Sequence, residues 1–372
     1  MLSVDADIPG GNILVDQIDG DELHLRPDLR DTDGEQFYWC FRVRHAAGRR
    51  LRVRFAAGSP VAALGPAVSV DGGMTWRWLG QGSATKSDFE FLVPPLPGDS
   101  EVRFGMGMTY TRLHFERFLQ CVGPHPMLQS QELCRSRAGR SVLIYRIGTE
   151  AAPHRVLVTA RHHACEMMAS FAVEGLLQQL LSDDRHGRWL LANTQWLIAP
   201  FMDLDGVEAG DQGKNRRPHD HNRDYGPGSI YPEVAALKEA VPAWLQDNKL
   251  IMLDLHCPWI RGGNHERLHL VGDADLRVAR DQATFSAILQ QTHAGPLPYL
   301  ASDNIPYGTD WNTAANYGDK VSATRWAVRT LNTRMASSIE IPYAVARDIE
   351  VNADSARAFG KDMARAIAGY LT

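Results

Sequence analysis

Two side chains that could bind a metal ion follow directly on an apolar, β-branched run. The run, Val-Leu-Val-Thr-Ala at residues 156–160, is typical of a buried strand, and an amphipathic segment begins a few residues later. His163 and Glu166 lie at this junction, three positions apart. An imidazole and a carboxylate at positions i and i+3 share one face of a helix and can reach one ion. Because such a pair is more often solvated, the hypothesis of a metal site depends on partners elsewhere.

A third candidate ligand comes at the end of another apolar run. His256 closes an expected strand in the sequence Asp254-Leu-His256. Two histidines and one glutamate form a catalytic zinc set that leaves a fourth position for water. The alternative for His256 is an ordinary buried histidine bonded to the main chain. His162 could compete with His163 for the metal, but its spacing to Glu166 is less favourable, and we expect it to be a bystander.

A single carboxylate interrupts an apolar run near the end of the chain. Glu340 lies in the sequence Ala-Ser-Ser-Ile-Glu-Ile-Pro-Tyr, which is typical of a strand. A carboxylate is costly to bury unless it pairs with another group or serves a function. A general base that takes a proton from the attacking water at a zinc site would do so. The alternative is a structural salt bridge.

A long polar loop, residues 210–225, separates the candidate ligands and is crowded with cations and amides. Guanidinium groups with an amide nearby suit a carboxylate on a substrate. For Lys214 and Arg217, a solvated and charged loop is an equally good explanation.

The elements that must position these residues alternate between strand and helix after about residue 123. Strands are expected at 141–145, 155–160, 194–199 and 250–255, and helices at 165–181, 232–246, 276–292 and 354–370. This alternation predicts a mostly parallel or mixed sheet with helices on both faces. Ligands bind at the carboxyl ends of the strands in such sheets. Residues 123–372 are therefore expected to form the catalytic α/β domain.

The first part of the chain has a different rhythm. Short alternating runs are separated by turn residues, at 22–26, 36–44, 50–55, 88–93 and 101–106. Period-two alternation at this spacing predicts an antiparallel β-sandwich, and we assign it to residues 1–122. Packing and positioning are its expected role, and recognition of a remote part of a substrate is the alternative.

Composition narrows the class of protein. The 372 residues are 44% hydrophobic and 22% charged, with a formal net charge of -5, as in ordinary globular proteins. Without a basic footprint, nucleic acid is not an expected partner. No apolar run approaches a membrane span, and no secretory signal is visible, so no membrane partner is expected. Five cysteines without CxxC spacing argue against a disulfide framework and favour a cytoplasmic location.

These pieces, taken together, resemble the zinc carboxypeptidases, also called funnelin metallocarboxypeptidases. His-x-x-Glu, Asp-Gly, Asp-x-Asn-Arg, Asp-Leu-His and a strand with a lone glutamate follow one another in the family's order, from His163 to Glu340. The resemblance implies roles for seven residues: His163, Glu166 and His256 bind Zn²⁺, Asp220 orients the first histidine, Asn222 and Arg223 hold the terminal carboxylate of the substrate, and Glu340 is the catalytic glutamate.

Two family residues have only approximate counterparts. The arginine that polarises the scissile carbonyl would fall near Gln212 and Gly213, and Arg216 is the best substitute. The family's mobile tyrosine should fall just upstream of Gly308, where Tyr307 is the nearest candidate. Core packing explains Tyr307 equally well.

The N-terminal part is similar to the β-sandwich that precedes the catalytic domain in cytosolic carboxypeptidases. The similarity is carried by residues 37–44, 50–55 and 110–119. That branch removes glutamates from protein tails. The resemblance therefore implies the two-domain architecture, and points to release of acidic residues.

Three functions are compatible with these residues. The first is zinc-dependent hydrolysis of the C-terminal peptide bond of a peptide or protein. The second is an amidase or deacylase acting on N-acyl amino acids or cell-wall peptides, because the same zinc set cleaves any amide beside a carboxylate. The third is a peptide-binding protein without catalysis. Side-chain preference and oligomeric state cannot be read from the sequence.

Overall fold

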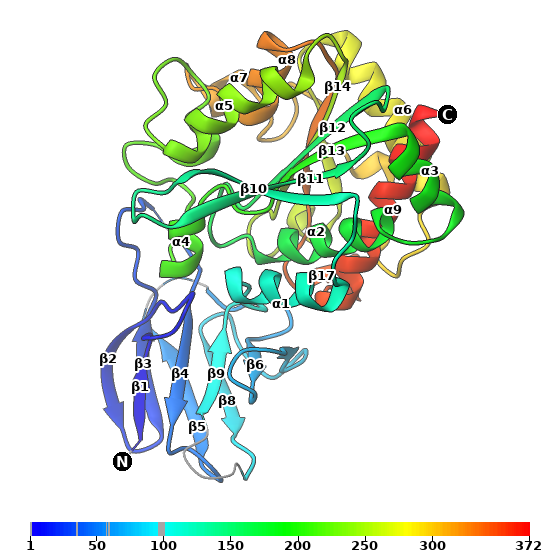
Figure 1. Cartoon of the computed structure of the whole chain (residues 1–372). Coiled ribbons are helices and arrows are strands. Elements are labelled where there is room, and N and C mark those ends of the chain that lie inside the picture. The colour runs from blue at the N-terminus through cyan, green and yellow to red at the C-terminus, as the bar shows by residue number, and fades with distance from the viewer. Residues whose placement is uncertain (1, 35, 57, 59, 96–100) are drawn as a thin grey trace.

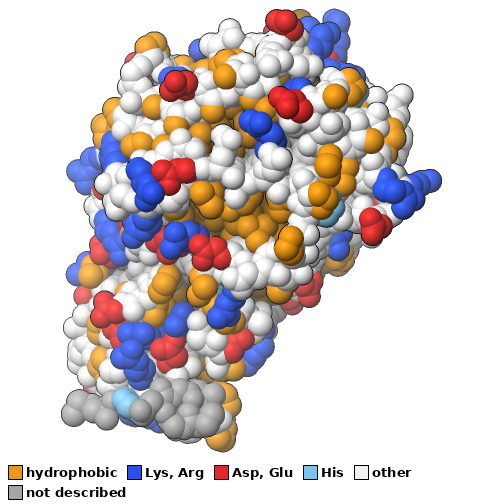
Figure 2. Space-filling view, in the orientation of Figure 1, with side chains coloured by type: hydrophobic (Ala, Val, Ile, Leu, Met, Phe, Trp, Pro, Cys, Tyr) orange, Lys and Arg blue, Asp and Glu red, His pale blue; other side chains and the backbone are white. Residues whose placement is uncertain are grey.

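The computed structural model describes residues 2–34, 36–56, 58, 60–95 and 101–372. Two β-sheets form the N-terminal part, and a third sheet covered by helices forms the rest (Figure 1). The chain begins at the far end of the N-terminal sheets and ends in a helix packed on the α/β part (Figure 1). On the face shown in Figure 2, acidic and basic side chains are interspersed, and no patch of one sign dominates it.

The N-terminal part is a β-sandwich. Its sheets have the orders β1 (Ser3–Asp5), β4 (Cys40–Arg44), β9 (Glu101–Gly105), β6 (Ala67–Ser69), β7 (Arg77–Trp78), and β2 (Leu14–Asp19), β3 (Glu22–Arg26), β5 (Arg50–Phe55), β8 (Asp88–Leu92). Burial alternates along β5, as the sequence pattern predicted. The pairs are antiparallel except β3 with β5, which is parallel. The chain leaves β3 for β4 in the other sheet and returns as β5 in the same direction.

The third sheet is mixed, which confirms the predicted fold class. Its order is β10 (Leu128–Arg135), β11 (Ser141–Gly148), β13 (Thr194–Ala199), β12 (His154–Ala160), β14 (Leu250–His256), β16 (Thr333–Glu340), β15 (His269–Val271). The four strands β13, β12, β14 and β16 run parallel, and the outer pairs are antiparallel. Every residue of β14 is buried because helices cover both faces.

Helices lie on both faces of this sheet (Figure 1). They are α1 (Arg112–Val122), α2 (Met167–Leu180), α3 (Arg185–Asn193), α4 (Leu204–Ala209), α5 (Pro232–Leu245), α6 (Leu276–Thr292), α7 (Ala314–Tyr317), α8 (Ala323–Thr330) and α9 (Ala353–Leu371). Alternate residues of β14 point to opposite faces: Ile251 and Leu253 belong to the core with α2 and α9, and Leu250 and Met252 to the core with α5 and α8. A short hairpin, β17 (Val345–Ala346) and β18 (Ile349–Glu350), precedes α9.

The two parts share one hydrophobic core. The buried cluster that contains Phe37 and Phe104 of the sandwich continues into α2 and α9. Helix α1 lies just before the predicted boundary at residue 122 and contacts α2 and α4. The boundary itself stays a prediction. Among the described residues, no helix is long and apolar enough to cross a membrane.

Candidate metal centre and active site

The candidate ligands meet at the carboxyl ends of three neighbouring parallel strands. After β12, a turn carries His163 and leads to Glu166, which is the N-cap residue of α2. His256 is the last residue of β14 and Glu340 the last residue of β16, and the two are paired in the sheet register. Because β12, β14 and β16 lie side by side and run parallel, residues distant in sequence converge at one edge of the sheet.

Two imidazoles converge on one carboxylate. His163 Nδ1 lies 2.8 Å from Glu166 Oε1, and His256 Nδ1 lies 2.8 Å from Glu166 Oε2. Ligand atoms of the three residues all lie within 4.8 Å of one another. Two ring nitrogens and one carboxylate oxygen facing a common point are the donor set that suits Zn²⁺. The structure therefore brings together the three predicted ligands in a geometry that fits the metal.

Each histidine is oriented by a carboxylate on its other nitrogen. His163 Nε2 lies 3.5 Å from Asp220 Oδ1, and His256 Nε2 lies 2.7 Å from Asp254 Oδ2. Such partners fix the ring and the tautomer, so that Nδ1 is free to bind the metal. The role of Asp254 was not predicted, although its spacing offered a signal: residues i and i+2 of a strand lie on the same face.

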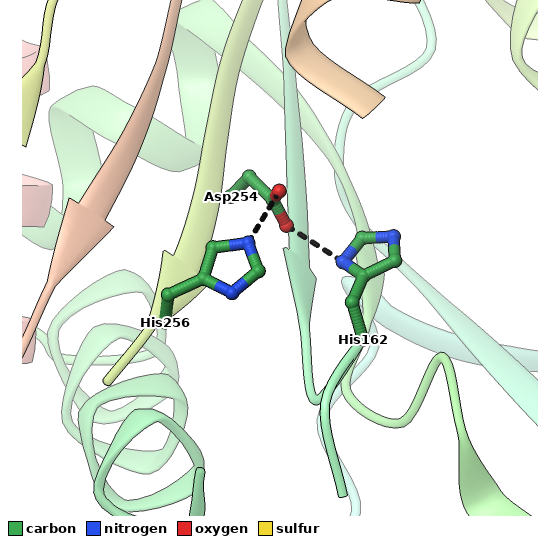
Figure 3. Close-up of side chains that lie close together, drawn as sticks. All are labelled: His162, Asp254 and His256. Atoms are coloured by element: carbon green, nitrogen blue, oxygen red, sulfur yellow. Dashed lines mark hydrogen bonds and ion pairs between the residues drawn. The ribbon is translucent and has the colours of Figure 1, made fainter. Parts of the chain in front are cut away.

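His162 lies behind the candidate metal ligands and contacts Asp254, the carboxylate that also binds His256. Its Nδ1 lies 2.8 Å from Asp254 Oδ1, so that Asp254 lies between the rings of His162 and His256 (Figure 3). Its Nε2 lies 2.7 Å from the Tyr225 hydroxyl. By distance alone, His162, Asp254 and His256 could also hold an ion. Neither His162 nor Asp254 lines the active-site cavity, however, and a catalytic metal needs an open position.

The pKa values of two buried carboxylates in the site are lowered by the basic side chains around them. Burial alone would raise the pKa of Glu166, but His163, Lys214 and His256 hold it well below the ordinary value. In the same way, burial of Asp254 is outweighed by His162 and His256, which lower its pKa. A site that keeps buried carboxylates ionised suits a bound cation.

A cavity of about 350 Å³ opens over the candidate ligands. Its wall includes aromatic side chains and the residues expected to bind substrate: Trp259, Trp311, Tyr317, Asn222, Arg223 and Glu340. Glu340 Oε2 is buried without a hydrogen-bond partner, and no salt bridge joins Glu340 to another described residue. The structural salt bridge considered for Glu340 is therefore absent from the described part of the chain, and its carboxylate borders the cavity.

Asn222 and Arg223 lie in a short 3₁₀ turn, η1 (His221–Arg223), at the cavity. Asn222 Oδ1 accepts a hydrogen bond of 3.0 Å from the Ala323 main chain, and its Nδ2 lies 3.1 Å from His256 Nε2. The guanidinium carbon of Arg223 lies 5.3 Å from the centre of the Tyr317 ring. This arrangement holds an amide and a guanidinium beside the metal centre.

The structure corrects the expectations for Arg216 and Tyr307. Arg216 does not line the cavity: its guanidinium is bound by three carboxylates, Asp203 and Asp31 at 2.8 Å and Asp211 at 2.7 Å. Tyr307 lies outside the cavity as well, and Tyr317 lines it instead. Spacing within an irregular loop does not fix which side chains turn inward, which is why both assignments were wrong.

Lys214, which the sequence left undecided, lies inside the cavity wall. Its Nζ lies 2.9 Å from Glu166 Oε1 and donates hydrogen bonds to the main-chain oxygens of Cys257 at 2.7 Å and Pro258 at 3.2 Å. Burial would lower its pKa, but Glu166 is the main group that raises it, so the amine is charged. Lys214 is therefore a partly buried cation beside Glu166 in the cavity wall.

Comparison with known proteins finds zinc carboxypeptidases. The family profile described as zinc carboxypeptidase matches residues 116–237. Cytosolic carboxypeptidase 2 of Danio rerio is 30% identical over 127 residues, 31% of this chain and 18% of that protein. Cytosolic carboxypeptidase 6 of Caenorhabditis elegans is 22% identical over 194 residues, 50% of this chain and 40% of that protein. The matches thus span less than half of these relatives.

Solved structures share the fold over the whole chain. A metallo-carboxypeptidase from Burkholderia cenocepacia superposes with a TM-score of 0.79 at 21% identity, covering 100% of this chain and 98% of that one. A metallo-carboxypeptidase from Pseudomonas aeruginosa, solved with (2-guanidinoethylmercapto)succinic acid, gives 0.78 at 20% identity and covers 99% of both. At this identity the likeness concerns the fold. Residues 116–237 therefore match the zinc carboxypeptidase domain profile, and the whole chain shares the fold of the solved metallocarboxypeptidases.

Proposed function

We propose that the protein is a zinc-dependent carboxypeptidase that hydrolyses the C-terminal peptide bond of peptide or protein substrates. The observation that carries this proposal is the set of residues that line one cavity. The candidate zinc ligands, the unpartnered carboxylate of Glu340 and the Asn222–Arg223 pair all border it. A metal site, a base and a carboxylate receptor within one cavity are what hydrolysis at a chain terminus requires.

The residues have separate roles in this proposal. His163, Glu166 and His256 would hold Zn²⁺, which would supply Lewis acidity for the scissile carbonyl and for the attacking water. Glu340 accepts the proton of that water and passes it to the leaving amine. Its carboxylate has no hydrogen bond or salt bridge among the described residues that would compete for the proton.

Asn222 and Arg223 bind the free carboxylate of the substrate. Arginine matches a carboxylate with two parallel N–H bonds, and the amide adds a further donor. An internal peptide bond offers no such charge at this position. The pair therefore restricts the enzyme to chain ends and holds the terminal bond at the metal.

Lys214 takes the role that the sequence had suggested for Arg216. Its ammonium lies at the metal ligand Glu166 and lines the cavity. A fixed positive charge at this place stabilises the negative charge that develops on the carbonyl oxygen in the transition state.

The charges around the cavity favour acidic or neutral terminal residues. Among the described residues, Glu166 and Glu340 are the carboxylates that line it, and both already have roles at the metal site. A basic side chain would find no free carboxylate there. Lys214 and Arg223 line the cavity, and Arg325 lies 3.8 Å from the centre of the Tyr317 ring. We therefore propose that acidic residues are released preferentially.

The compartment that we propose is the cytoplasm. The curated relatives are named cytosolic carboxypeptidases. The five cysteines are free, as expected in a reducing compartment.

A panel of short peptides tests this function. Peptides ending in Glu, Ala, Leu and Lys, their C-terminal amides and matched N-acyl amino acids are incubated with the zinc-loaded protein. Release of the last residue from free peptides, fastest for Glu and much slower for the amides, is the expected result. Cleavage of N-acyl amino acids alone would favour the deacylase. Zinc binding without any turnover would favour the peptide-binding protein.

A further inference from the structure

The loop that carries Lys214 is held by the N-terminal sandwich. Main-chain hydrogen bonds link the two parts, from Arg217 N to Asp31 O at 2.9 Å and from Asp33 N to Asn215 O at 3.2 Å. The sandwich also contacts the cavity wall. The Phe37 ring packs edge-on against Trp259, which lines the cavity, with the ring centres 4.8 Å apart. The sandwich therefore packs against the loop that carries Lys214 and against the cavity wall at Trp259.

Gln212 is the most specific contact in this interface. Its side chain is 1% exposed. Its Oε1 accepts a hydrogen bond of 2.7 Å from Tyr38 N, and its Nε2 donates one of 2.7 Å to Tyr38 O. One side-chain amide thus satisfies both polar main-chain groups of a buried residue in the segment that leads into β4. Breaking either bond would leave a buried group without a partner, so Gln212 is fixed in place.

Gln212 and its neighbour touch the turn that bears the metal ligands. The main-chain oxygen of Gln212 accepts a hydrogen bond of 3.2 Å from Cys165 N. Gly213 has φ +79°, and a Cβ added there would lie 2.2 Å from Ala164 N. Because the two backbones pack without a gap, a displacement of this loop must displace the ligand turn.

Lys214 completes the connection. Its ammonium binds Glu166 on one side and the main-chain oxygen of Cys257, the residue after His256, on the other. It therefore joins the two segments that bring the second and third metal ligands. The path from sandwich to metal site runs from Tyr38 through Gln212 and Lys214 to Glu166.

We propose that Gln212 is a positioning residue of the metal centre, through which the N-terminal sandwich fixes Lys214 against Glu166. The sandwich is then a structural component of the active site. This inference rests on the proposed zinc site, and it does not depend on which substrate is cleaved.

Cobalt-loaded full-length protein tests this proposal without any substrate. The visible absorption of Co²⁺ reports its coordination geometry, and titration against a competing chelator gives the dissociation constant. Gln212→Leu removes both bonds to Tyr38 at similar volume. We expect an altered cobalt spectrum and a dissociation constant raised about 10-fold, the lower end of the range for residues that orient metal ligands.

Asn12→Ala is the matched control. Asn12 is a buried amide of the same interface. Its side chain forms hydrogen bonds with Gly210 O at 2.7 Å and with the main chain of Asp28, and none with residues 212–214 among the described residues. It should leave the cobalt spectrum and affinity at the wild-type values. A wild-type spectrum and affinity in Gln212→Leu would overturn the proposal, as would equal changes in Asn12→Ala. If Gln212→Leu does not fold, Gln212→Glu, which keeps the acceptor for Tyr38 N, is measured with the same expectation.

A double substitution tests the path through Lys214. In a Lys214→Met background, Gln212→Leu should change the cobalt affinity clearly less than the roughly 10-fold expected with Lys214 present, because one of the two contacts between this loop and the metal ligands is gone. Two independent effects that multiply would overturn the proposal. If the wild-type protein cleaves no peptide, the proposed function is contradicted and this proposal is not, because the cobalt measurements need no turnover.

Discussion

The substitution Arg223→Met isolates the charge that we assign to the terminal carboxylate of the substrate. Arg223 lines the cavity, and its guanidinium forms no ion pair with a carboxylate in the part of the chain that the structure describes. Methionine keeps an apolar chain over the Tyr317 ring and removes the charge. The fold should therefore be preserved, and the change should be confined to substrate binding.

The expected loss follows from the two hydrogen bonds that a guanidinium makes to a carboxylate. Each charge-assisted bond contributes about 1.5–3 kcal/mol. Because the cavity is open to solvent and Asn222 remains, the lower value applies, about 3 kcal/mol for the pair. At about 1.4 kcal/mol for each factor of ten, kcat/KM should fall about 150-fold.

The assay compares one peptide with its C-terminal amide in the wild type and in Arg223→Met. The 150-fold loss should appear with the free peptide and disappear with the amide, which has no charge for Arg223 to bind. An equal loss on both substrates would mean that the variant has damaged the site in general. No loss on either would refute the assignment of Arg223.

Three further substitutions test other parts of the site and fold. Glu340→Gln should lower kcat about 10²- to 10⁴-fold with unchanged zinc content, measured by turnover and metal analysis, because the proton acceptor is lost. Asp254→Asn should lower the free energy of unfolding in urea by about 3–5 kcal/mol, since it leaves buried partners without their charge; an unchanged value would contradict its role. Hydrogen bonds from Gln179 and from the main chain lower the pKa of Asp184 to about 2. Its contribution to stability is therefore present above about pH 4 and lost as the pH falls towards 2, and Asp184→Asn should flatten the urea-unfolding free energy over this range.

The strands and helices with strong periodic signals were predicted from the sequence. The apolar runs at 155–160 and 250–255 became β12 and β14, because strands covered on both faces need continuous apolar runs. The helix predicted at 276–292 is α6, which begins after Asp275, whose carboxylate accepts main-chain hydrogen bonds at the N-terminus.

Elements with weak signals were missed. Strand β10 is an edge strand with mostly exposed polar residues, so its sequence lacks an apolar face to recognise. The parallel pairing of β3 with β5 depends on how the chain crosses between sheets, which local alternation does not encode. Both features arise from tertiary contacts.

The candidate site was predictable where regular elements carry it. His163, Glu166, His256 and Glu340 lie at strand ends, and their relative positions follow from the parallel sheet. The loop residues were harder, because an irregular backbone gives no rule for which side chain turns inward. Lys214 and Tyr317 face the cavity, and Arg216 and Tyr307 do not.

The support behind the ligands could have been sought in the sequence. Asp254 is two positions before His256 on a strand, on the same face. His162 could not be assigned in this way, since its contact with Asp254 crosses from the turn after β12 to β14. Pairs across strands need the register, which only the structure supplies.

The most direct test of the metal centre is a crystal structure of the zinc-loaded protein with anomalous data collected at the zinc edge. We expect one strong peak about 2.0–2.2 Å from Nδ1 of His163, Nδ1 of His256 and a carboxylate oxygen of Glu166. A peak between His162, Asp254 and His256, or no peak at the cavity, would contradict the proposed metal site and the mechanism built on it.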